Sequence, residues 1–267
     1  MTTEFTPDGL CLDEYASNQS LAEVYFKRAV GQLPEMECAK AIAKIVAQRI
    51  QPGDTILDVG CGAGHYLRSF KRFVPVPFKY VGIDYSPIFL AKAEQAWKNE
   101  PIAGFRQGSI FELPVSDREF DIVVCSNLIM HLPGIVKPVG ELILASRRLV
   151  IIRTMIGDRS FHIQEVYSNK WWPYTDVSSG DEFDDNGKPR AYSYENIYSM
   201  DYFSGVIHRH APTARIDYIE DDQFDAENIQ RSAETEGLVN ATRMIEGKQV
   251  FGYIILPYMF VIIDVSG

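Results

Sequence analysis

Apolar residues recur at helical spacing in the first part of the chain. Between Ser20 and Ile50 they fall three or four positions apart, which is the repeat of an amphipathic helix. Pro34 interrupts this stretch and Pro52-Gly53 ends it, because proline and glycine break helices. The pattern therefore predicts two helices before residue 53.

From residue 55 onward, short apolar runs alternate with amphipathic segments. Strands are predicted over residues 55–59, 79–83, 120–126 and 148–154, with a short one near Phe105. Helices are predicted over residues 64–73 and 87–99. Strands that alternate with helices at this spacing predict a parallel, doubly wound sheet.

The alternation stops after Gly157. Residues 158–198 are rich in aromatic and acidic residues and are predicted to form an inserted lid. Ser199 is the expected N-cap of a helix that runs through His210, and two strands are predicted near residues 215–220 and 250–265. We expect one α/β domain with a mostly parallel, seven-stranded, Rossmann-like sheet. Its parts are an N-terminal helical segment, a central core, the insertion and a C-terminal completion, at residues 1–53, 54–157, 158–198 and 199–267.

Composition narrows the class of protein and of partner. The 267 residues are 46% hydrophobic and suffice for one large α/β domain. The formal net charge is −10, and such a surface repels phosphate backbones and anionic membranes. Nucleic acid and membranes are therefore disfavoured as partners.

Targeting and metal signals are weak. No basic segment followed by an apolar run opens the chain, and the longest apolar stretch, residues 253–265, is broken by Pro257 and too short for a membrane span. The four cysteines show no CxxC pairing, so neither a zinc site nor a disulfide framework is expected. These features favour a cytoplasmic protein without a bound metal.

A glycine-rich turn follows the first predicted strand. Residues 57–66 read LDVGCGAGHY, with Gly60, Gly62 and Gly64 at alternate positions. Glycine permits a positive φ and lets a ligand approach the backbone closely. The helix that follows offers unpaired N–H groups and a partial positive charge at its start. The turn is therefore a candidate ligand site.

The residues around the turn discriminate between two ligand classes. Dinucleotide-binding turns follow GxGxxG, and the sixth position here is His65 instead of a small residue. Asp58 precedes the turn, where a carboxylate would repel a pyrophosphate but would attract a cationic amino-acid group. The turn therefore favours S-adenosylmethionine over a nicotinamide cofactor.

This segment resembles the first motif of the class I S-adenosylmethionine-dependent methyltransferases. Three later segments match the family in order, namely residues 81–86 (VGIDYS), 107–110 (QGSI) and 120–127 (FDIVVCSN). The resemblance covers about residues 57–154 and implies S-adenosylmethionine as cofactor and S-adenosylhomocysteine (SAH) as product.

The resemblance also implies a set of donor-binding residues. Asp84 would accept hydrogen bonds from both ribose hydroxyls, since a carboxylate has two acceptor oxygens, and Tyr85 would pack on the adenine. Ser109 stands where the family often has an acid, which leaves the adenine amino contact open. The N-terminal segment would cover the donor, or else pack on the sheet edge. The expected donor-binding residues are Asp58, Gly60, Cys61, Gly62, Gly64, Asp84, Tyr85, Ser109, Ile110, Asn127, Leu128, Tyr15 and Tyr25.

Methyl transfer is an in-line displacement that depends mainly on alignment, which can contribute roughly 7–11 kcal/mol. A general base is required only if the acceptor must lose a proton. His131, four residues beyond Asn127, is the candidate base. The alternative is that His131 braces the following helix without proton transfer.

The acceptor is inferred by elimination. After the fourth predicted strand the chain reads SNLI, which lacks the Asn/Asp-Pro-Pro-aromatic run of base amino methyltransferases and the paired glutamates of arginine methyltransferases. A small-molecule acceptor remains. The binding site for this acceptor would be lined by residues of the insertion, namely Trp171, Trp172, Tyr174 and His162. The alternative is that the aromatic residues form a satellite core.

Two other functions stay open. An aminopropyl transferase shares the fold but usually has an acid where this chain has Asn127. A regulatory or scaffold protein would bind the donor without catalysis. The sequence does not indicate an oligomeric state.

Overall fold

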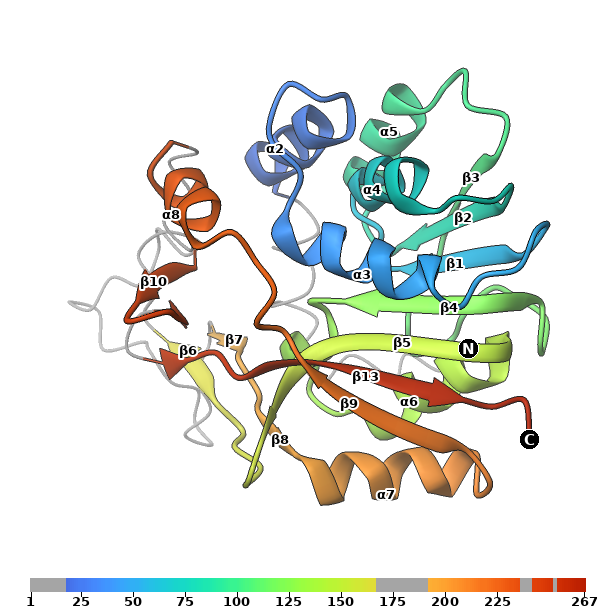
Figure 1. Cartoon of the computed structure of the whole chain (residues 1–267), viewed down its shortest axis with the longest axis vertical. Coiled ribbons are helices and arrows are strands. Elements are labelled where there is room, and N and C mark those ends of the chain that lie inside the picture. Colours follow the sequence, from blue (N-terminus) through green and yellow to red (C-terminus); the bar gives the residue numbers. More distant parts are fainter. Residues whose placement is uncertain (1–17, 167–191, 236–241, 252–253) are drawn as a thin grey trace, which may run out of the picture.

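A central sheet with helices on both faces organises the computed structural model, which describes residues 18–166, 192–235, 242–251 and 254–267 (Figure 1). Seven strands form its main path, in the order β3-β2-β1-β4-β5-β13-β9. Their bounds are Ala103–Gln107, Lys79–Asp84, Thr55–Val59, Phe120–Ser126, Ser146–Gly157, Tyr258–Asp264 and Arg215–Glu220.

The first five strands of this path are parallel, whereas β13 runs antiparallel to both of its neighbours. A short strand, β8 (Tyr198–Ser199), also pairs with β5. The predicted mostly parallel sheet is confirmed, and with β8 it has eight strands instead of the expected seven. The chain winds outward from β1 in one direction through β2 and β3, and in the other through β4 and β5. Ligands of such sheets bind at the carboxyl ends of the strands on either side of this reversal.

Helices α3 (Glu37–Ala47), α4 (His65–Phe73) and α5 (Pro87–Ala96) lie on one side of the sheet, and α6 (Val136–Ala145) and α7 (Met200–His210) on the other (Figure 1). Each face has its own apolar cluster. Neighbouring residues of β4 contribute to different clusters, Ile122 to that of α3 and α4 and Val123 to that of α6 and α7. This is the two-residue period of a strand buried on both faces.

Helix α2 (Gln19–Ala29) packs on other helices instead of the sheet. Its Leu21 and Ala22 contact Phe89 of α5, and Glu23 pairs with Lys92 at 2.6 Å. Arg68 of α4 donates to the carbonyl oxygens of Arg28 and Leu33, at 2.9 and 2.8 Å, and so satisfies acceptors at the end of α2. Of the two alternatives for the N-terminal segment, packing against the sheet describes α3, whereas α2 packs on α4 and α5.

The C-terminal part differs from prediction. The single strand expected over residues 250–265 is divided into β11 (Lys248–Phe251), β12 (Ile254–Ile255) and β13. Pro257 directly precedes β13, and proline lacks the N–H that a continuous strand would use. Strand β10 (Arg243–Ile245) joins β11 and β12 in a separate antiparallel sheet beside α8 (Ala226–Thr235).

The insertion is described at its two ends, where β6 (Gln164–Val166) pairs antiparallel with β7 (Tyr192–Tyr194). A 3-10 turn, η1 (Ile129–His131), follows β4.

Over the parts of the chain that the structure covers, every helix is too short or too polar to cross a bilayer.

Candidate active site

The glycine turn is fastened to the end of β2. The amides of Gly60 and Cys61 both donate to the carbonyl oxygen of Ile83, at 2.7 and 3.1 Å, and the amide of Gly62 donates to Oδ2 of Asp84 at 2.8 Å. The structure therefore brings the glycine turn and the VGIDYS segment together, because Asp84 lies beside the turn and hydrogen-bonds to it.

Three glycines give the turn its shape. Gly60, Gly62 and Gly64 have φ of +78°, +54° and +67°, which residues with a Cβ rarely adopt. A Cβ on Gly60 would lie 2.8 Å from Leu128, and one on Gly62 would lie 3.0 Å from the ring of Tyr25. Leu128, which follows β4, therefore borders the turn on one side, and Tyr25 of α2 borders it on the other.

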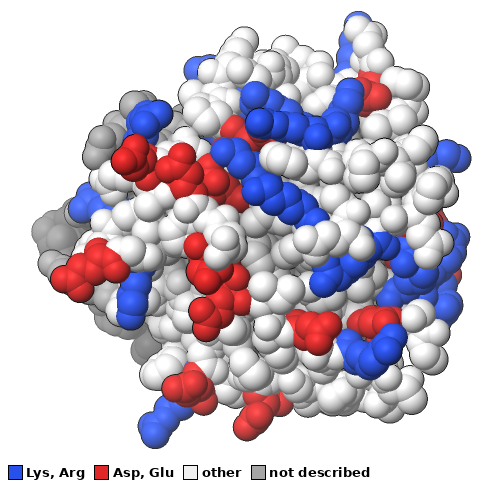
Figure 2. Space-filling model, in the orientation of Figure 1, with Lys and Arg blue, Asp and Glu red and all other residues white. Residues whose placement is uncertain are grey.

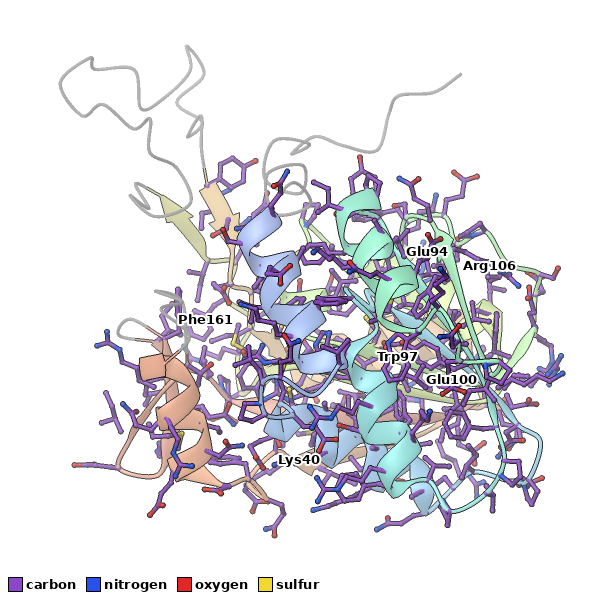
Figure 3. The ribbon with its side chains drawn as sticks, turned by 90° about the horizontal axis from the view of Figure 1, so that it is seen from above. Lys40, Glu94, Trp97, Glu100, Arg106 and Phe161 are labelled. Carbon is purple, nitrogen blue, oxygen red and sulfur yellow. The ribbon has the colours of Figure 1, made fainter. Side chains whose placement is uncertain are left out.

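Gly64 is required for packing beneath the turn. A Cβ there would lie 2.9 Å from Phe105 and from Nε1 of Trp97. That indole nitrogen also donates to the carbonyl oxygen of Gly64 at 3.0 Å, and Trp97 lies between α4 and α5 (Figure 3). A larger residue at position 64 would push the indole away from the start of α4.

Asp84 is held in one orientation. Its Oδ2 accepts from Gly62, and its Oδ1 accepts from the amide of Ser86 at 2.9 Å. Burial raises the pKa of Asp84, while these amide hydrogen bonds oppose that rise by favouring the carboxylate. Tyr85, next in the chain, is 46% exposed.

Asp58 lies beneath the turn and not on its surface. It is 2% exposed and accepts a hydrogen bond from the hydroxyl of Tyr80 at 2.7 Å. Burial, with a smaller contribution from the charge of Asp84, raises the pKa of Asp58 to about 7. A positive charge bound above the turn would therefore favour its ionised form.

Cys61 also points away from the turn. It is 1% exposed, and its Sγ would lie 2.7 Å from a Cβ placed on Gly82. Burial raises the pKa of the Cys61 thiol, so this cysteine is an inert core residue. Only its main chain can contribute to a ligand site.

The third motif forms a tight turn after β3. The amide of Gly108 donates to the carbonyl oxygen of Asp84 at 3.0 Å, which places this turn next to β2. Oγ of Ser109 accepts from the amide of Phe111 at 3.2 Å, and Ile110 is 7% exposed within the apolar core. Ser109 is therefore the more accessible of the two expected adenine contacts.

Asn127, at the end of β4, has a φ of +57° and a fully engaged carboxamide. Its Oδ1 accepts from Arg153, and its Nδ2 donates to the hydroxyl of Tyr66 at 3.3 Å. What this strand end can offer a ligand is its main chain and the side chain of Leu128, which covers Gly60.

Arg153 was not among the sequence-derived candidates. It is 3% exposed, and its Nε and Nη2 donate to Oδ2 of Asp221 at 2.8 and 2.5 Å. The guanidinium carbon lies 3.6 Å from the ring centroid of Tyr258. An arginine inside the apolar run of residues 148–154 was the only sequence signal for this buried pair.

His131 is attached to the insertion. Its Nδ1 lies 2.9 Å from the carbonyl oxygen of Tyr194 and 3.4 Å from Oε1 of Glu195. A carbonyl only accepts, so Nδ1 carries the proton and Nε2 carries the lone pair. His131 therefore braces the insertion, and the neutral ring in this tautomer has its acceptor at Nε2.

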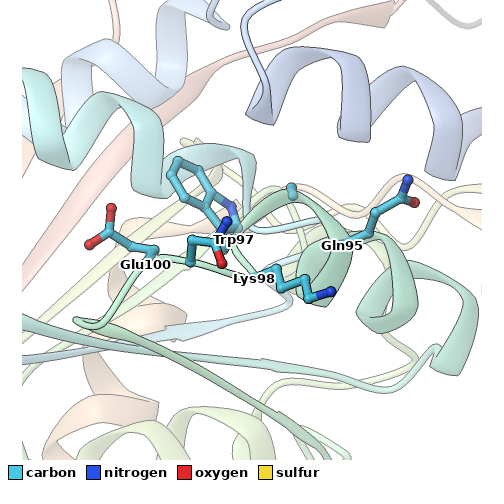
Figure 4. A pocket seen from close by; sticks show the side chains of 6 residues that line it. Gln95, Trp97, Lys98 and Glu100 are labelled. Atoms are coloured by element: carbon cyan, nitrogen blue, oxygen red, sulfur yellow. The ribbon is translucent and has the colours of Figure 1, made fainter.

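Of the other acceptor-side candidates, the structure describes His162. The ring of His162 lies 4.7 Å from that of Tyr194. Trp171, Trp172 and Tyr174, and also Tyr15 of the donor-side set, lie outside the described residues. A shallow pocket near the end of α5, formed by residues 95–100, contains none of the candidate residues (Figure 4). Across the described ranges no group of three or more His, Cys, Asp or Glu side chains could hold a metal.

Sequence comparison identifies the segment that carries these motifs. Residues 56–142 match the family model of the methyltransferase domain. An uncharacterized methyltransferase of Schizosaccharomyces pombe is 37% identical over 101 residues, which is 35% of this chain and 36% of that protein. A demethylmenaquinone methyltransferase of Alkalihalophilus pseudofirmus is 29% identical over 96 residues, which is 35% of this chain and 41% of the relative. These matches cover less than half of the curated relatives.

Structural comparison extends the likeness to the whole fold. A magnesium protoporphyrin IX methyltransferase from Synechocystis, solved with SAH bound, has a TM-score of 0.56 at 11% identity. The match covers 96% of this chain and 99% of that one. At this identity the comparison supports the architecture alone.

Proposed function

From the premise that residues 56–142 form a class I S-adenosylmethionine-dependent methyltransferase domain, we propose that the protein transfers a methyl group from S-adenosylmethionine to a small-molecule acceptor. The hydrogen bond between Gly62 and Asp84 carries this proposal. This hydrogen bond joins the glycine turn, where a ligand can approach the backbone closely, to the oriented carboxylate of Asp84. S-adenosylmethionine needs both features, because it has an amino-acid end and a ribose.

The residues present fit this cofactor. Asp84 would hold the ribose hydroxyls, Tyr85 and Ser109 would flank the adenine, and the space over Gly60 and Gly62 would take the methionine part. Leu128 and Tyr25 border that space, and a Cβ at Gly60 or Gly62 would press on them. The cofactor supplies a methyl group on a sulfonium, and the chain's task is to align the acceptor and exclude water.

His131 would serve as the base where the acceptor must lose a proton. Its Nδ1 hydrogen bond with Tyr194 leaves the Nε2 lone pair to accept that proton, and Glu195 would stabilise the imidazolium that forms. The residue lies three positions after Leu128, close to the end of β4.

Several observations support a small acceptor. Arg153 donates to Oδ1 of Asn127, so this oxygen is already paired inside the protein and is less suited to recognise a base amino group. On the face shown in Figure 2, basic side chains gather near α3 and α4 and acidic ones near α8 and β9, so this face is not uniformly basic. The name of the demethylmenaquinone relative also refers to a small molecule. A cytoplasmic location agrees with the free, buried Cys38, Cys61 and Cys125.

The first test is binding of SAH, measured by calorimetry beside NADH and decarboxylated S-adenosylmethionine. Asp84→Ala is expected to weaken SAH binding tenfold or more, because losing a charge-assisted hydrogen bond costs about 1.5–3 kcal/mol. Asp117→Ala, at an exposed carboxylate, is the matched control and should bind as the wild type does. Binding of NADH in place of SAH would refute the proposed cofactor.

The second test identifies the acceptor class with S-adenosylmethionine labelled in its methyl group. We expect label in the small-molecule fraction of a metabolite mixture, and much less label there when Asp84→Ala replaces the wild type. Label found only in tRNA or in basic proteins would contradict the small-molecule proposal. SAH binding with no transfer to any fraction would favour a regulatory or scaffold role.

A further inference from the structure

A buried nitrogen without a hydrogen-bond partner lies beside the glycine turn. His65 is the first residue of α4 and is 8% exposed. Among the described residues, nothing hydrogen-bonds to its Nδ1, although this atom is buried. Burying an unpaired polar nitrogen opposes folding, so such an atom points to a partner that binds later.

The imidazole is clamped by aromatic rings. Tyr25 of α2 stacks on it with ring centroids 4.4 Å apart and an interplanar angle of 24°. The ring of Tyr66 meets it edge-on at 4.9 Å. Two aromatic neighbours hold the ring in place, so the direction of its nitrogens is set before any ligand arrives.

The ring faces the centre of the turn. A Cβ on Gly62 would lie 3.5 Å from Cε1 of His65, the carbon between the two ring nitrogens. The amide of the same glycine donates to Asp84. Gly62 therefore separates the proposed ribose position from the imidazole, and a donor that lies across the turn would bring its amino-acid end to His65.

The imidazole is neutral at physiological pH. Burial, with a smaller contribution from the positive charge of Arg28, lowers the pKa of His65 to about 3. A neutral imidazole can donate from one nitrogen, and the nearby guanidinium of Arg28 makes an anionic partner more favourable than a cationic one.

We propose that His65, stacked on Tyr25, recognises the carboxylate at the amino-acid end of the donor through its Nδ1 hydrogen. The residue is a specificity determinant and takes no part in the transfer itself. The assignment rests on the proposed function, since it presumes that the turn binds S-adenosylmethionine.

Calorimetry with three ligands tests the assignment. SAH carries the whole amino-acid end, its decarboxylated analogue lacks the carboxylate, and 5′-methylthioadenosine lacks the end altogether. His65→Phe should weaken SAH binding about tenfold or more and leave the other two ligands unchanged. His208→Phe, at an exposed histidine of α7, is the matched control and should alter none of the three affinities.

The melting temperature distinguishes carboxylate recognition by His65 from a purely structural role of this residue. A core histidine needed for packing would lower the melting temperature when replaced. By contrast, His65→Phe removes the unpaired nitrogen and should leave the melting temperature of the ligand-free protein unchanged or higher. Should this variant fail to fold, Tyr25→Leu, which removes the stacking ring, is expected to weaken SAH binding selectively as well.

The outcomes distinguish the proposed function from the proposed role of His65. Failure of the wild type to bind SAH would overturn the proposed function. Unchanged SAH affinity in His65→Phe, beside normal wild-type binding, would overturn only the role of His65. An equal loss for the decarboxylated analogue would overturn the carboxylate assignment.

Discussion

Asp221→Ala is expected to lower the free energy of unfolding by about 3–5 kcal/mol, because it leaves a buried guanidinium without its carboxylate. Arg153 and Asp221 have side chains that are 4% and 3% exposed. With the carboxylate gone, Arg153 retains Asn127 and the ring of Tyr258, which carry no negative charge to balance it. Urea unfolding followed by circular dichroism measures the change.

Two variants complete this experiment. Asp222→Ala changes the adjacent, exposed acid and should cost little. The double variant Arg153→Met, Asp221→Leu removes both charges and should recover much of the loss, since apolar replacements of a buried pair are often neutral. A loss in Asp221→Ala no greater than that in Asp222→Ala would show that the pair contributes nothing to stability.

Gly64→Ala is expected to destabilise the protein by about 2–5 kcal/mol, the sum of two effects. The left-handed backbone costs a residue with a Cβ roughly 1–2 kcal/mol, and overpacking adds about 1–3 kcal/mol. The added carbon would lie 2.9 Å from Phe105 and from Trp97, whose indole is held by its hydrogen bond to Gly64.

Gly247→Ala is the matched control. Gly247 has a φ of +77°, and a Cβ there would meet no atom within 4 Å. This variant should therefore lose only the backbone contribution, about 1–2 kcal/mol. The difference between the two variants in urea unfolding measures the packing of Trp97 on the turn. Equal losses would contradict the close approach described here.

Local signals predicted much of the sheet and of the donor site. The apolar run at residues 120–126 is β4, and the helix predicted from Ser199 through His210 is α7, capped by Ser199. The motifs around Gly62 and Asp84 meet because the carboxyl ends of parallel strands share one edge of the sheet. These features follow from periodicity and turn chemistry within short windows.

Other features depend on contacts that a local pattern does not contain. Arg153 and Asp221 are 68 residues apart, and their pairing exists only once β5, β9 and β13 have assembled. Helix α8 was not predicted, because its sequence AENIQRSAET is mostly polar. The orientation of Cys61 into the core also escaped prediction, since it depends on the absence of a side chain at Gly82.

The position of β13 sets an order on folding during synthesis. In the described sheet β13 lies between β5 and β9, so β9 has no partner until residues 258–264 have been made. Until then, one side of β5 is an unpaired strand edge with a long apolar sequence, the kind of edge that invites pairing with other chains. A ribosome that pauses before residue 258 would therefore hold a nascent chain whose donor-binding strands are complete but whose sheet is still open to aggregation.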